Sequence, residues 1–156
     1  LPGGLIAGGT TVRGGGGSRS TQNEAKLFLW DPSKKQKVFE VAPVPGQRSI
    51  NALAVGPDGL LYGFAGRTMF AFDPKERTVL LTRPHGLGGL IANAIGPGPE
   101  GKLYGLSRRG IFTVDTEKRE ARMLARHPGG ITAGFAIRDR QIFFAKGSQI
   151  VSYTLP

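Results

Sequence analysis

The sequence predicts an all-β fold built from repeated four-stranded sheets. Its 156 residues include 25 Gly and 11 Pro, which divide the chain into short apolar runs. Runs of four to eight residues between turn-forming residues are typical of strands. No segment keeps the apolar spacing of a helix, so we expect essentially no helix. The length suits one domain, and we expect residues 1–156 to form it.

The strongest single observation is an internal repeat of 42 residues. It is carried by Trp30-Asp31-Pro32, Phe72-Asp73-Pro74 and Val114-Asp115-Thr116, and by Leu61-Tyr62-Gly63 and Leu103-Tyr104-Gly105. A fourth copy, Gln141-Ile142-Phe143-Phe144, follows its counterpart at a shift of 39. A period of this size is typical of repeat architectures.

One period contains four candidate strands, at residues 50–55, 60–64, 68–72 and 78–82. In the third run, aromatic residues alternate with positions that are also mostly apolar, so both faces of the sheet must be buried. A small sheet cannot shield two apolar faces alone, but stacking against its own copies does so. Four strands per repeat with buried faces predict the blade of a β-propeller.

We count about three and a half blades along the chain. We name the four strands of a blade a to d, from the axis outward. Residues 5–41 supply strands b, c and d, with an inserted loop at 10–24. Residues 48–82 and 89–125 form full blades, and residues 131–155 supply strands a, b and c. A closed propeller needs at least about four blades. We therefore expect the C-terminal part of a larger propeller of about six to eight blades, with the remaining blades in the same or another chain.

The motif Gly-Pro-Asp-Gly-Leu-Leu-Tyr-Gly at 56–63 and Phe-Asp-Pro at 72–74 carry a family resemblance. They resemble the broad NHL, YVTN and WD-like propeller group, and the likeness covers nearly the whole chain. There is no Trp-Asp dipeptide with its His in each repeat, and no kelch double glycine. The resemblance implies an architecture and not an activity. It also implies that the d-to-a and b-to-c connections share one rim, usually the ligand-binding one.

The net charge of +10, from 21 Lys and Arg against 11 Asp and Glu, gathers on that predicted rim. The candidate ligand-binding residues, which we call the basic rim, are Arg13, Arg19, Arg48, Arg67, Arg83, Arg108, Arg109, Arg126 and Lys146. Lys26 lies at its margin, and Glu24 is the one carboxylate expected there. Arginine binds carboxylate, sulfate or phosphate with a planar fork, so these residues favour an anion receptor over a merely charged surface.

The opposite rim mixes both signs, and we expect the Asp of each of its turns to be structural. In the inserted loop, glycines 14–17 expose amides that could cradle an anion with Arg13 and Arg19; the alternative is a flap that contacts nothing. His85 and His127 occupy matching connections and are the candidates for acid–base catalysis, with plain loop residues as the alternative. With no carboxylate near them, we expect no metal and no cofactor.

These patterns favour a non-catalytic propeller module that binds an anionic ligand such as acidic polysaccharide. The resemblance to propeller families implies one alternative, an enzyme, either a lyase on uronate-containing polysaccharide or a lactone hydrolase, although Asn51 and Asn93 near the channel lack a partnering acid. Another is a scaffold for an acidic protein. Nucleic acid is less favoured because the rim has almost no aromatic residues.

Two kinds of site and partner are excluded by composition. The absence of Cys removes disulfides and thiolate sites. No apolar run approaches the roughly 18 residues of a membrane span, so we expect no membrane partner. The sequence does not identify the cellular compartment, and it slightly favours a soluble protein outside the cytoplasm.

Overall fold

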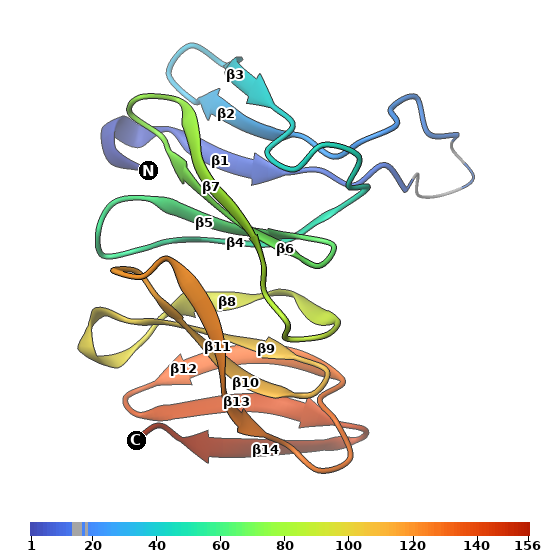
Figure 1. Ribbon diagram of the computed structural model, residues 1–156, viewed down its shortest axis with the longest axis vertical. Helices are drawn as coiled ribbons and strands as arrows, with labels where there is room; N and C mark the ends of the chain where they lie inside the picture. Colours follow the sequence, from blue (N-terminus) through green and yellow to red (C-terminus); the bar gives the residue numbers. More distant parts are fainter. Residues whose placement is uncertain (14–16, 18) are drawn as a thin grey trace.

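The computed structural model describes residues 1–13, 17 and 19–156. This part of the chain folds into four antiparallel sheets that follow one another along the long axis of the molecule (Figure 1). Two short 3-10 turns, Pro2–Gly4 and Pro99–Gly101, are its only helical segments. No helix in the described residues has the length and apolar character needed to cross a membrane.

Each sheet is a meander in chain order. The first holds β1 (Ile6–Gly9), β2 (Leu27–Asp31) and β3 (Gln36–Val41). The second holds β4 (Ile50–Val55), β5 (Leu61–Ala65), β6 (Thr68–Asp73) and β7 (Thr78–Pro84). The third holds β8 (Leu90–Pro97), β9 (Leu103–Ser107), β10 (Gly110–Asp115) and β11 (Glu120–Arg126). The fourth holds β12 (Ala133–Arg138), β13 (Gln141–Lys146) and β14 (Gln149–Thr154). The prediction of an all-β fold of repeated antiparallel sheets is confirmed.

The sheets bury their faces against one another, as the repeat predicted. Every residue of β5 and of β9 is buried, although neighbouring side chains on a strand point to opposite faces. One core cluster joins Tyr62 and Phe64 of the second sheet to Leu103 and Phe112 of the third. The Phe64 and Phe112 rings meet edge to face with their centroids 5.4 Å apart. Stacking therefore supplies the core that a single sheet lacks.

The turns between the last two strands of the first three sheets are closed by aspartate, as expected. Asp73 accepts hydrogen bonds from the amides of Lys75 and Glu76, at 2.8 and 3.1 Å. Asp31 and Asp115 bond the amides of their own turns in the same way. These three carboxylates are thus structural.

Candidate functional site

The connections predicted to share a rim are joined by backbone hydrogen bonds. The amide of His85, in the connection after β7, donates to the carbonyl of Arg67 in the turn between β5 and β6, at 3.1 Å. One sheet further on, the amide of His127 donates to the carbonyl of Arg109 at 3.0 Å. The d-to-a and b-to-c connections therefore lie side by side, and the side chains they carry share one end of the sheets.

A cavity of about 640 Å³ lies on this rim at the junction of the second and third sheets. Arg67 comes from the turn of the second sheet, and Arg108 and Arg109 come from the turn of the third. All three side chains are exposed. Within the described residues none of them forms an ion pair, so three unmatched positive charges face one hollow.

The floor of this cavity is the glycine-rich connection between β7 and β8. Gly86 and Gly88 have φ of 65° and 83°, a region that other residues rarely adopt. A Cβ on Gly88 would lie 3.1 Å from the Cδ and Nε atoms of Arg109, so glycine lets the arginine lie across the backbone. Among the described residues, the amides of Gly86 and Gly88 donate no hydrogen bond. Two N–H groups therefore remain for an anion beside the guanidinium groups.

The one carboxylate expected on the basic rim is already paired. Glu24 Oε1 lies 2.6 Å from Lys26 Nζ, and Glu24 Oε2 accepts the amide of Gly46 at 3.1 Å. The hydrogen bond from Lys26, with that of Gly46, lowers the pKa of Glu24. Glu24 is therefore charged and matched by Lys26, and it leaves the arginines unneutralised.

Other candidates line smaller hollows along the same rim. Arg13 and Arg48 border one of about 310 Å³, and Arg13 with Arg19 borders another of about 180 Å³. Arg126 is exposed at the end of β11, and half-buried Lys146 ends β13 beside Gly129. Of the glycines expected to cradle an anion, 14–16 lie outside the described residues, as does Ser18.

Arg83 departs from its expected place. We expected it in a connection, but β7 continues through Pro84. Its Nη1 atom lies 3.5 Å from Glu120 Oε2 at the start of β11 and 3.5 Å from the carbonyl oxygen of Lys118 in the turn before it. The side chain of a strand residue projects from the face of its sheet and does not extend along the connection that follows the strand. Arg83 thus bridges two sheets instead of joining the cavity.

His85 is held by the backbone on both sides of its ring. Its side chain is 7% exposed, Nε2 lies 3.2 Å from the carbonyl oxygen of Gly66, and Nδ1 accepts the amide of Leu87 at 3.1 Å. Burial lowers the pKa of the imidazole, against the hydrogen bond to Gly66. A neutral ring with both nitrogens engaged closes the turn and has no free lone pair for a substrate proton.

His127 differs from its counterpart. Its ring lies edge-on to Phe144, at 5.2 Å and 88°, and its buried Nδ1 has no hydrogen-bond partner among the described residues. The described residues bring no three His, Cys, Asp or Glu together as metal ligands.

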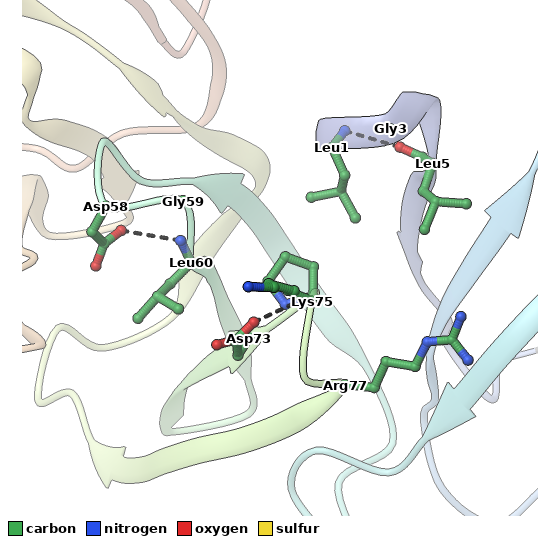
Figure 2. Close-up of a pocket in the computed structure, with 10 residues that line it drawn as sticks. Leu1, Gly3, Leu5, Asp58, Gly59, Leu60, Asp73, Lys75 and Arg77 are labelled. Atoms are coloured by element: carbon green, nitrogen blue, oxygen red, sulfur yellow. Dashed lines mark hydrogen bonds between the residues drawn. The ribbon is translucent and has the colours of Figure 1, made fainter.

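A second cavity, of about 600 Å³, lies on the opposite rim and was not expected from the sequence. Figure 2 shows Leu1 and Leu5 of the first turn on one side, and Leu60 with the Asp73 turn on the other. Lys75 and Arg77 also line it. Both of its carboxylates already accept hydrogen bonds: Asp58 accepts the amide of Leu60 and the hydroxyl of Tyr62, and Asp73 accepts the amides of its own turn. Mixed charges around apolar residues give this cavity no preference for an anion.

No protein-family model matches the chain, and no curated protein is similar to it. Its fold is shared with solved structures of WD40 repeat proteins. It is similar to the structure of U3-55K, with a TM-score of 0.56 and 14% identity. It is also similar to the crystal structure of RRP9 WD40 repeats, with a TM-score of 0.59 and 14% identity. Both alignments cover 85% of this chain.

The architecture is that of a WD-like β-propeller. The chain spans 46% of the length of each of these two propeller chains, so it corresponds to about half of such a protein. At this identity the likeness shows the fold alone. The propeller arrangement explains why turns far apart in the sequence meet at one rim.

Proposed function

We propose that this chain is a non-catalytic propeller module that binds an acidic polysaccharide on its basic rim. The observation that carries the proposal is the convergence of Arg67, Arg108 and Arg109 on one cavity, without carboxylate partners in the described residues. Guanidinium groups bind carboxylate and sulfate through paired hydrogen bonds, and they are weakly hydrated. The open amides of Gly86 and Gly88 add donors of fixed direction.

The composition of the rim supports a polysaccharide over single-stranded nucleic acid. The connections at 42–49, 85–89 and 127–132 and the turns at 66–67 and 108–109 contain no Phe, Tyr or Trp. Binders of single-stranded nucleic acid place bases on aromatic side chains. The carboxylates of a uronate chain can instead bind the guanidinium groups directly.

The engagement of His85 supports binding without turnover at the arginine cavity. A lyase needs a base with a free lone pair near the substrate carboxylate. His85 borders the cavity, but both of its nitrogens are bonded to the backbone. The enzyme alternative therefore has no base ready at the arginine cavity.

The second candidate is an acidic protein partner. The similarity to WD40 repeat proteins favours it, and the same cations would accept aspartate or glutamate side chains of a peptide. A matched comparison of polyglutamate with polygalacturonate separates the two candidates.

The test is a titration of the full chain with polygalacturonate and with heparin. The variant R67A/R108A/R109A should lose about a thousandfold in affinity, since each of the three lost charge-assisted contacts is worth about a factor of ten. The matched control K34A/K75A/K118A removes the same charge from the opposite rim and should bind as the parent does. If the two triple variants lose the same affinity, the binding is nonspecific charge attraction and the proposal is wrong. Tighter binding of polyglutamate would favour the protein partner, and a new ultraviolet-absorbing unsaturated product would favour the lyase.

A further inference from the structure

The basic rim repeats one arrangement at successive sheet junctions. A cation at or next to the b-to-c turn of one sheet lies beside a glycine in the connection from the preceding sheet. At the junction of the second and third sheets, Arg109 lies beside Gly88. At the next junction Lys146 lies beside Gly129, where a Cβ would come within 2.9 Å of the lysine Cε. A cation therefore lies beside the glycine-rich connection at both of these junctions.

The backbones that carry these cations are anchored on both sides. The amide of Arg108 donates to the carbonyl of Gly89 at 2.8 Å, and the carbonyl of Arg108 accepts the amide of Ile131 at 3.1 Å. The carbonyl of Arg48 accepts the amide of Val12 at 2.9 Å. The turn after Lys146 is held by the amide of Gly147, which donates to Thr132 Oγ1 at 3.1 Å. Anchored turns present their side chains at fixed intervals, which lowers the ordering cost of binding.

The hollows on the rim adjoin one another. Gly66 lines both the arginine cavity and the hollow beside Arg48. Arg13 lines that second hollow and also the third, beside Arg19. Cations therefore border a continuous series of depressions from the inserted loop to the third sheet.

Resting on the proposed function, we propose that the basic rim is a linear track for an extended uronate chain. The chain lies across at least three sheet junctions and presents carboxylates to successive cations. A compact anion would need only the Arg67, Arg108 and Arg109 cavity and would leave Arg48 and Lys146 unused. Tethered contacts raise the effective concentration of each further contact, so affinity grows with every junction that a ligand reaches.

The test is a length series of oligogalacturonates, from disaccharide to dodecasaccharide, titrated into the full chain. Two variants remove two charges each: R108A/R109A in the middle of the track and R48A/K146A towards its ends. Affinity should rise by about a hundredfold or more once an oligomer spans several junctions. R48A/K146A should lower the affinity for the longest oligomer by about tenfold or more and leave that for the disaccharide unchanged. R108A/R109A should weaken both.

The outcomes separate the track from the proposed function. If affinity does not depend on the length of the oligomer, the ligand occupies one cavity and the track is wrong. The same conclusion follows if R108A/R109A weakens binding but R48A/K146A leaves the affinity for the longest oligomer unchanged. If no oligomer binds, or if R108A/R109A does not change the affinity, both the proposed function and the track are wrong. Polyglutamate that binds more tightly than an oligogalacturonate of equal charge would overturn the uronate assignment.

Discussion

Gly63 on β5 faces Phe70 on β6, and the Phe70 ring occupies the space where a side chain at Gly63 would lie. The same pairing recurs as Gly8 with Phe28 and Gly105 with Phe112, and the fourth sheet reverses the sizes by pairing Phe144 with Val151. One small and one large residue therefore fill each hairpin, and the glycine is required by packing and not by backbone angle.

A methyl group at Gly63 should destabilise the fold. Gly63→Ala drives a Cβ into a buried phenylalanine ring, and overpacking of this kind costs about 1–3 kcal/mol. Gly89→Ala is the matched control, because its Cβ would meet Arg108 at 3.5 Å, an ordinary contact. Urea unfolding measures both. A loss for Gly63→Ala no larger than for Gly89→Ala would contradict this packing, and Phe70→Leu should relieve part of the loss.

The Tyr62 hydroxyl should stabilise the turn that leads into β5. It donates to Asp58 Oδ2 at 2.6 Å and lies 3.2 Å from the carbonyl oxygen of Thr116 in the third sheet. Tyr62→Phe should cost about 1.5–3 kcal/mol, since the acceptor is charged. Tyr104 stands one repeat later, and its hydroxyl makes no hydrogen bond within the described residues. Tyr104→Phe should therefore be nearly neutral in the same unfolding assay, and equal costs would refute the role of the hydrogen bond to Asp58.

His85 should make the fold weaken on mild acidification. Burial holds its folded pKa below the ordinary 6.5, so the unfolded chain binds the extra proton first. The stability it contributes is complete above that value and is lost as the pH falls through the lowered folded pKa. Unfolding midpoints at about pH 7.5 and about pH 5.5 bracket this window, because carboxylates titrate lower still. His85→Gln should remove most of the difference, and an unchanged difference would assign the effect to other groups.

Arg83 should be dispensable for anion binding. Its guanidinium faces Glu120 of the neighbouring sheet, and exposed pairs of this kind contribute little to stability. Arg83→Ala should bind polygalacturonate like the parent chain, whereas Arg67→Ala should bind it about tenfold more weakly. Calorimetric titration compares the two. A comparable loss in Arg83→Ala would return this residue to the binding surface.

The repeat carried most of the fold prediction, because its period, apolar runs and turn residues all follow from the order of residue types. The sequence also predicted that Arg67, Arg108 and Arg109 lie on one rim. That prediction requires only the order of the strands, because the order decides which turns lie at the same end of the sheets. Arg83 was misplaced because β7 extends two residues beyond its apolar run. Strand ends of this kind are set by pairing with β6 and not by local composition.

Two further features depend on contacts that no local pattern reveals. The engagement of His85 requires the carbonyl of Gly66 and the amide of Leu87 to meet the ring from two segments. The cavity on the opposite rim joins Leu1 and Leu5 to a turn more than fifty residues later. Spacing within the repeat predicts which turns share a rim, but not which side chains those turns enclose.

The central claim is that one rim of the propeller receives the anion, and chemical-shift mapping with an oligogalacturonate tests it most directly. The largest changes should fall on the amides of Gly86 and Gly88 and on the side-chain Nε–H groups of Arg67, Arg108 and Arg109. The turns at 74–77 and 116–119 on the opposite rim should stay unchanged. Shifts concentrated on those turns, or spread evenly over both rims, would contradict the account.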